Sequence, residues 1–208
     1  DDGPLSHDGD IYQYDNVEVY PKPATESGPP IYLGGTSKPA VDRAAYRGDG
    51  FFGNANMGWQ PEDSGDGEDT FDHWGDQSTY IAENHDVDIN DYFVGMLNYC
   101  FVAETDEEAW ETMLPSFLYT RRNYAAHSTH RDPEEFTLEN LDEERIQRLK
   151  NHILVGSPET VVERLKETEQ DATGEIHMAL RMWQPLLSLE ENAESIRLFG
   201  EEVMPEFS

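Results

Sequence analysis

Two patterns of hydrophobic residues alternate along most of this chain. Short apolar runs, typical of buried strands, lie at 30–33, 49–52, 92–103 and 175–182. Apolar residues that recur every three to four positions, typical of helices, lie at 39–47, 79–84, 105–124, 141–152, 158–170 and 187–203. Strands that alternate with helices in this way predict an α/β fold with a parallel sheet.

The first such unit has clear boundary signals. Pro39 suits the first position of a helix whose N-cap is Ser37 or Lys38, and Gly48 ends that helix. The resulting strand, turn, helix and strand over 30–52 fit two parallel neighbours in one sheet.

The lead-in over 1–29 is different, because it is rich in Pro and Gly. Apolar residues alternate around Asp15-Asn16, which predicts a small hairpin turning at that dipeptide. An extended run follows at the prolines. We expect one domain over 1–208, in which βα units occupy 30–208.

Charge narrows the function classes. The chain has 44 acidic residues against 14 basic ones, a net charge of −30. Such a surface repels nucleic acid and anionic lipid. Apolar residues make up 37% and aromatic residues 11%, which favours a folded chain over an acidic disordered one. Salt at 1 M screens charges beyond about 3 Å, so we predict a salt-adapted, cytoplasmic protein of the halophilic type.

Other classes are disfavoured by what the chain lacks. It has no apolar run of the roughly 18 residues that a membrane span needs, and it opens without a secretory signal. The single cysteine, Cys100, rules out a disulfide within the chain and a multi-cysteine metal site, and it is expected to be a buried small hydrophobe. His127 and His130 have no partner at metal-binding spacing, so we expect no metal.

Five stretches carry a family pattern, in order and with its spacing. They are PPIYLGGTS at 29–37, RAAYRGDGFF at 43–52, VAETDEEA at 102–109, VGSPETV at 155–161 and FGEEVMPEF at 199–207. Together they resemble the luciferase-like monooxygenase family, the flavin- and deazaflavin-dependent barrels related to bacterial luciferase.

The resemblance implies a (β/α)8 TIM barrel of which this chain covers approximately strands 5–8. A parallel half-barrel leaves two sheet edges and half a core exposed, which is unfavourable. The chain is therefore expected either to lack an N-terminal half that belongs to a longer protein, or to complete its barrel with another chain, as in a homo-oligomer.

The strongest candidate site is the turn Gly34-Gly35-Thr36-Ser37 between a strand and a helix. Glycines let a ligand approach the backbone, and N–H groups and hydroxyls can hold an anion against the helix dipole. The resemblance implies that the flavin phosphate binds here, near Ser37. The alternative is an ordinary turn with a serine cap. The pattern is neither a G-x-G-x-x-G fingerprint nor a Walker loop.

Further candidates lie after the next strand. Gly50, Gly53 and Asn54 are expected to let the phosphate or ribityl chain approach; alternatively, Gly50 relieves packing and Asn54 caps a turn. Asn56 and Trp59, in the following loop, are candidates for the substrate pocket, because strand carboxyl ends carry the site in this fold. Surface packing is the alternative for Trp59.

The last strand supplies His177 and Arg181, on one face by the two-residue period, and Trp183 at its end. If that face points into the barrel, His177 and Arg181 could bind an anionic substrate or the flavin ring, with Trp183 in the substrate pocket. If it points outward, they are structural. A basic cluster could close over an anionic cofactor tail or decorate a helix C-terminus. Its members are Arg121, Arg122, His127, His130 and Arg131.

The sequence thus predicts a flavin- or F420-dependent oxidoreductase or monooxygenase with a small-molecule substrate. FMN and F420 both stay open as cofactors. The alternative is a non-catalytic flavin-binding barrel, or a subunit that completes another chain's barrel. A sugar-phosphate barrel enzyme is disfavoured, because it would hold phosphate after the last two strands.

Overall fold

The computed structural model describes residues 3–35, 37–54, 71, 75–128 and 132–207, which divide into two compact units. The first unit, residues 1–31, contains one antiparallel hairpin of β1 (Leu5–Asp8) and β2 (Gln13–Val17). The second unit, residues 32–208, contains the parallel sheet and every helix of the described residues.

The predicted turn of this hairpin is wrong. The chain reverses between Asp8 and Gln13, where the Gly9 N–H donates to the Tyr12 carbonyl at 3.1 Å. Asn16 instead lies within β2 with φ of 54°, at the point where the pairing register shifts. Asparagine tolerates this left-handed conformation, so the signal marks a β-bulge rather than a turn.

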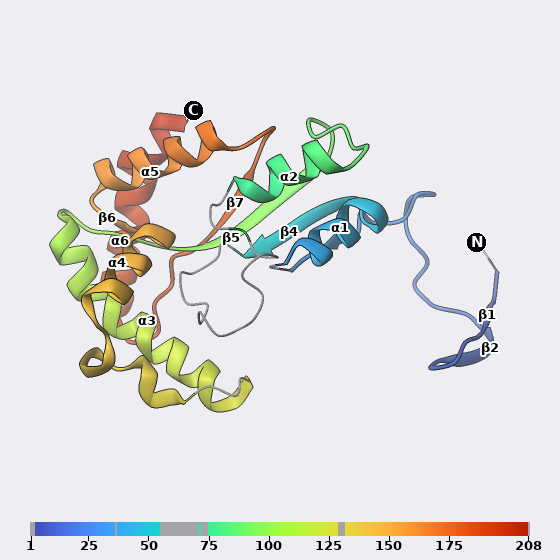
Figure 1. Cartoon of the computed structure of the whole chain (residues 1–208), viewed down its shortest axis with the longest axis horizontal. Helices are drawn as coiled ribbons and strands as arrows, with labels where there is room; N and C mark the ends of the chain where they lie inside the picture. Colours follow the sequence, from blue (N-terminus) through green and yellow to red (C-terminus); the bar gives the residue numbers. More distant parts are fainter. Residues whose placement is uncertain (1–2, 36, 55–70, 72–74, 129–131, 208) are drawn as a thin grey trace. The chain divides into compact units, whose positions relative to one another are not determined.

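Five parallel strands form the sheet of the second unit (Figure 1). They are β3 (Tyr32–Leu33), β4 (Gly50–Asn54), β5 (Phe93–Val102), β6 (Leu154–Gly156) and β7 (His177–Arg181). The long β5 is central: 93–97 pair with β4, 95–99 with β7, and 100–102 with β6. The predicted α/β class and parallel sheet are confirmed. β6 was not predicted, because its three residues, in the short apolar run after Lys150-Asn151-His152, give too brief a strand signal.

Six α-helices accompany the strands among the described residues. They are α1 (Lys38–Arg47), α2 (Asp76–Asn84), α3 (Asp106–Ser128), α4 (Glu143–His152), α5 (Pro158–Asp171) and α6 (Leu189–Leu198). Short 3₁₀ turns at Pro133–Phe136 and Leu138–Asn140 join α3 to α4. The closing helix predicted over 187–203 is shorter, because the chain continues from Leu198 as a π-helical turn, Phe199–Val203, and a 3₁₀ turn, Met204–Phe207.

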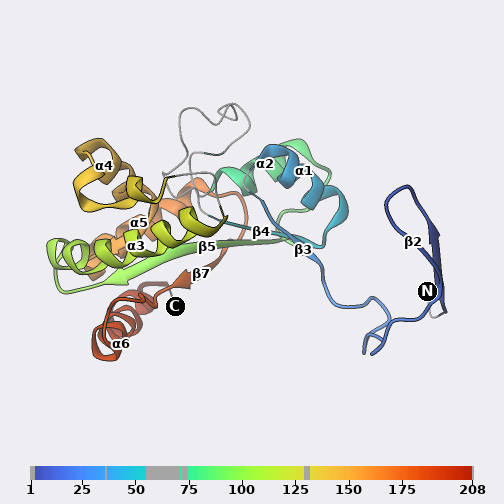
Figure 2. The ribbon, with the colours of Figure 1, turned by 90° about the horizontal axis from the view of Figure 1, so that it is seen from below.

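Side chains on one face of β5 point toward most of the helices. Val94 and Met96 pack with α1 and α2, and Cys100 and Val102 pack with α5 and α6. Figure 2 shows α1 and α2 together near β3 and β4, with α3, α4 and α5 toward the carboxyl end of β5. This is the layered packing of a parallel α/β sheet.

Among the described residues, α3 covers the opposite face of the sheet toward its carboxyl end, where it packs against Tyr99 and Phe101. Toward the amino end it presents stacked rings. Phe93 stacks on Tyr32 at 4.2 Å and on His177 at 4.6 Å between ring centroids. Tyr32 is 43% exposed and Phe52 is 37% exposed. A contiguous exposed aromatic surface of this kind is typical of an interface.

Asp106 joins the starts of α3 and α5. Its carboxylate accepts hydrogen bonds from the Ser157 N–H at 2.7 Å and from the Thr160 hydroxyl at 3.0 Å. The bond from the Ser157 backbone is the main cause that lowers the pKa of Asp106. Within the described ranges, no helix has the length and apolar character needed to cross a membrane.

Candidate functional site

Because the strands are parallel, their carboxyl ends meet at one side of the sheet, which is where α/β proteins bind ligands. The turn after β3, the end of β4 and the end of β7 therefore share that side. The described candidates there are Gly34, Gly35, Ser37, Asn54, Arg181 and Trp183.

The glycines of the β3–α1 turn are required by close packing. A Cβ on Gly34 would lie 2.4 Å from the Phe52 carbonyl oxygen, and one on Gly35 would lie 2.3 Å from the Cβ of Ala40. The backbone of the turn therefore packs directly against the backbone of β4 at Phe52 and against Ala40 in the first turn of α1.

Ser37 is the N-cap residue of α1, but its side chain makes no capping hydrogen bond. By contrast, the side chains of Asp142, Ser157 and Ser188 each accept a bond from the helix that they cap. The Ser37 hydroxyl is thus not committed to the helix, unlike an ordinary serine cap. Lys38 follows in the first turn of α1 and adds a cation, which sequence reasoning missed although the chain has few lysines.

The residues predicted on β4 lie at different levels. Gly50 opens the strand, far from its carboxyl end, and a Cβ there would lie 2.8 Å from atoms of both Phe93 and Tyr32. A Cβ on Gly53 would lie 2.6 Å from the Phe51 ring. Gly50 and Gly53 both lie where a side chain would clash, which agrees with the alternative that Gly50 relieves packing. Asn54 is the exposed last residue of β4 and lies at the candidate site.

His177 and Arg181 share a face, as predicted, and it is the face away from α1 and α2. They lie at opposite ends of β7, about 13 Å apart at the usual rise of a strand. His177 belongs to the aromatic stack with Phe93. Arg181 ends the strand and donates a hydrogen bond from Nη1 to the Tyr99 hydroxyl at 2.9 Å. Arg181 therefore lies at the carboxyl ends of the strands, where the candidate site is, and His177 does not.

Tyr99 was not singled out by sequence reasoning, because it sits inside the long apolar run. Its ring lies 5.0 Å from the Arg181 guanidinium carbon and meets Phe117 of α3 edge-on at 5.2 Å. Burial raises the pKa of Tyr99, while the charges of Arg181 and Arg121 oppose that rise. Two arginines thus act on one buried phenol.

The segment after β7 is held by Asn192 of α6. Its Oδ1 accepts from the Gln184 N–H at 2.7 Å, and its Nδ2 donates to the carbonyls of Gln184, Leu187 and Ser188. Both Asn192 and Gln184 are fully buried. The segment is therefore fixed, although Trp183 within it is 54% exposed.

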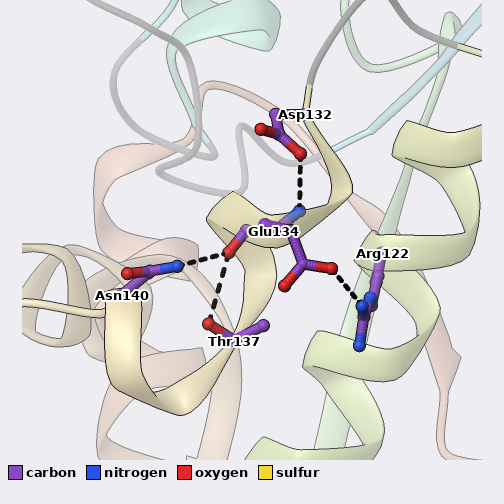
Figure 3. A network of polar contacts seen from close by, with 5 residues as sticks. All are labelled: Arg122, Asp132, Glu134, Thr137 and Asn140. Carbon is purple, nitrogen blue, oxygen red and sulfur yellow. Dashed lines mark hydrogen bonds and ion pairs between the residues drawn. The ribbon is translucent and has the colours of Figure 1, made fainter.

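The predicted basic cluster takes part in helix packing. Arg122 forms an ion pair with Glu134, whose N–H donates to Asp132 and whose carbonyl accepts from Thr137 and Asn140 (Figure 3). This network ties α3 to the following 3₁₀ turn and favours the structural reading of Arg122. His127 is exposed near the end of α3, while His130 and Arg131 lie outside the described residues.

Other predicted residues are untested by the geometry. Thr36, Asn56 and Trp59 lie outside the described residues. Cys100 is fully buried in β5, and burial raises the pKa of its thiol. Within the part of the chain that the structure describes, no group of three or more His, Cys, Asp or Glu side chains is placed to hold a metal ion.

The family model for luciferase-like monooxygenases matches residues 1–174. The chain belongs to the luciferase-like monooxygenase family. No curated protein matches it.

Solved structures give the same fold assignment for this luciferase-like chain. An F420-dependent secondary alcohol dehydrogenase, in complex with an F420–acetone adduct, matches with a TM-score of 0.65 and 17% identity, covering 100% of this chain and 57% of that one. The coenzyme F420-dependent tetrahydromethanopterin reductase from Methanopyrus kandleri gives 0.64 and 16%, covering 100% and 59%. A type II Baeyer–Villiger monooxygenase from Pseudomonas putida, in complex with FMN, gives 0.55 and 18%, covering 98% and 58%.

At these identities the likeness shows the fold. The luciferase-like chain spans 57–59% of the length of these solved structures, so it is a partial barrel. Among the described residues, β3 pairs only with β4, and β7 only with β5, which leaves one edge of each strand open. The open edges and the exposed aromatic face agree with this partial coverage.

Proposed function

We propose that this chain is the half of a flavin- or F420-dependent oxidoreductase that binds the phosphate of the cofactor. The observation that carries the proposal is the β3–α1 turn, in which the Ser37 hydroxyl makes no capping bond to its own helix. Gly34 and Gly35 let this turn pack closely against β4 and the start of α1. N–H groups and a hydroxyl at a helix start are suited to a phosphate.

The residues present fit such a group. Ser37 would donate its hydroxyl to a phosphate oxygen, and Lys38 would supply positive charge in a chain with a net charge of −30. Asn54, exposed at the end of β4, would contact the chain that links phosphate and ring. When bound, the cofactor supplies hydride transfer or oxygen activation, and the protein positions it.

The structural neighbours support both candidate cofactors, since they include two F420-dependent enzymes and one enzyme in complex with FMN. Both cofactors have a phosphate, so the turn is suited to either. Catalysis would then be a monooxygenation with FMN or a hydride transfer with F420, on a small-molecule substrate.

The remaining half of the barrel is part of this proposal. The five strands would form the second half of the barrel, which the sequence numbers approximately as strands 5–8, and 1–208 would be the C-terminal part of one barrel domain. A complementary half, in a longer polypeptide or in another chain, would pair with the open edges of β3 and β7 and cover Tyr32 and Phe52. His177 would then contribute to the packed barrel interior through its stack with Phe93.

The same exposed face favours a second candidate. The chain could act as a subunit that completes another chain's barrel, with flavin binding but without turnover. The two candidates differ in one readout, because only the enzyme oxidises or reduces a substrate.

Binding of FMN and of F420 to the native assembly that contains this chain tests the proposal. We expect one of the two to bind with a change in its visible absorption, followed by substrate-dependent turnover. Binding without turnover on any alcohol, ketone or aldehyde substrate would favour the subunit candidate. Failure to bind either cofactor would refute the proposed function.

A further inference from the structure

Arg181 is one of the few cations of this acidic protein. It is half-buried, and among the described residues it forms no ion pair with a carboxylate, although the chain has 44 acidic residues. By contrast, Arg122, Arg148 and Arg197 form ion pairs with glutamates. With no carboxylate paired to it among the described residues, the Arg181 guanidinium has further N–H donors that suit an anion.

The neutral partner of Arg181 holds its guanidinium in place. The Tyr99 hydroxyl accepts one N–H, and the Tyr99 ring lies 5.0 Å from the guanidinium carbon. Tyr99 is in turn fixed by Phe117 of α3. A guanidinium has five N–H donors, so the others remain directed away from this contact, and the Tyr99 O–H keeps its own proton to donate.

A second cation comes from α3. Arg121 lies one turn after Phe117, on the same face of the helix, and its guanidinium is 5.8 Å from the Phe136 ring in the cluster that contains Tyr99. Arg121 therefore adds positive charge beside Tyr99 without being the group that contacts it directly.

We propose that Arg181, Arg121 and Tyr99 form a binding site for a phosphate or carboxylate group of the substrate, at the carboxyl end of β7. The site is separate from the β3–α1 turn, since the order β3, β4, β5, β7 separates the two by three strand spacings, roughly 14 Å. The anion at Arg181 is thus a different group from the cofactor phosphate. That the anion belongs to a substrate rests on the proposed function, whereas the binding of an anion at Arg181 does not.

The test is a titration with inorganic phosphate, and separately with succinate, followed by the side-chain Nε–H resonances of Arg181 and Arg121. Potassium chloride is used at matched ionic strength throughout. We expect saturable shifts at Arg181 that KCl does not produce. Arg181→Gln is expected to weaken the binding of the better anion at least about tenfold, and Arg121→Gln by a smaller factor.

Arg47→Gln is the matched control, because Arg47 also stacks on a tyrosine, Tyr46 at 5.1 Å, but lies on α1 away from the site. It should bind the anions as the native protein does. Arg181→Lys keeps the charge without the planar fork and should bind with intermediate affinity, which separates a lost site from a lost fold. Tyr99→Phe removes only the hydroxyl and should weaken binding about threefold.

Equal anion affinity in the native protein and in Arg181→Gln would overturn the inference, as would the absence of a saturable shift at Arg181. Binding of FMN or F420 is measured on the same samples. Cofactor binding without anion binding refutes this site alone, whereas anion binding without cofactor binding refutes the proposed function alone.

Discussion

Lowering the KCl concentration from 2 M to 0.1 M is expected to lower the melting temperature by more than about 10 °C. The net charge is −30, and charges of one sign destabilise a compact chain by repulsion unless salt screens them. The screening length grows from about 3 Å at 1 M to about 10 Å at 0.1 M, so many more pairs repel at low salt. Thermal unfolding followed by circular dichroism across a KCl series measures the effect.

The acidic groove along α5 supplies a control for this prediction. Glu159, Glu163 and Glu167 recur at four-residue spacing and face Glu202 and Glu206 across a groove of about 650 Å³. Changing Glu163→Gln and Glu202→Gln together should raise the melting temperature by about 3 °C at 0.1 M KCl and leave it unchanged at 2 M. A melting temperature that does not depend on KCl would show that the acidic surface is not an adaptation to salt.

Asn192→Leu is expected to destabilise the protein by about 3 to 4 kcal/mol. Leucine has a similar volume but satisfies none of the four hydrogen bonds that Asn192 makes with the segment 184–188. The Gln184 N–H and carbonyl would stay buried without these partners, and each such group costs about 1–3 kcal/mol. Urea unfolding at fixed KCl, followed by tryptophan fluorescence, measures the change.

Asn151→Leu is the matched control, because Asn151 is an exposed helical asparagine that accepts a hydrogen bond from the Gln147 side chain, one turn earlier. It should change stability by less than about 0.5 kcal/mol. If Asn192→Leu behaved like Asn151→Leu, the segment after β7 would not be held by Asn192. The position of Arg181 would then need another explanation.

The parallel sheet was predictable because its strands are continuous apolar runs with helix signals between them. Pro39 and Ser157-Pro158 placed the starts of α1 and α5 correctly to within a residue. The hairpin turn was not predictable in this way, since an Asn with positive φ serves a bulge as well as a turn. Local sequence cannot distinguish these, because the pairing partner decides.

The candidate site was predictable only in part, for a related reason. The two-residue period placed His177 and Arg181 on one face. It did not show at which end of the barrel each side chain lies. Their separation follows from strand register, which sets His177 opposite Gly95 and Arg181 opposite Tyr99. The role of Tyr99 could not be predicted, because an aromatic residue in an apolar strand is expected to be a core residue. Only the structure places Arg181 beside it.

The comparison of FMN with riboflavin tests the cofactor-phosphate turn most directly, because the two ligands differ only in the phosphate. Affinities are measured for the native assembly and for its Ser37→Ala variant. If the assembly binds FMN, we expect it to bind FMN more tightly than riboflavin by at least about tenfold, and Ser37→Ala to reduce this ratio about threefold to tenfold without changing the affinity for riboflavin. If it binds F420, Ser37→Ala should weaken F420 binding about threefold to tenfold. A cofactor affinity that Ser37→Ala leaves unchanged, or equal affinities of an FMN-binding assembly for FMN and riboflavin, would contradict the placement of the phosphate at this turn.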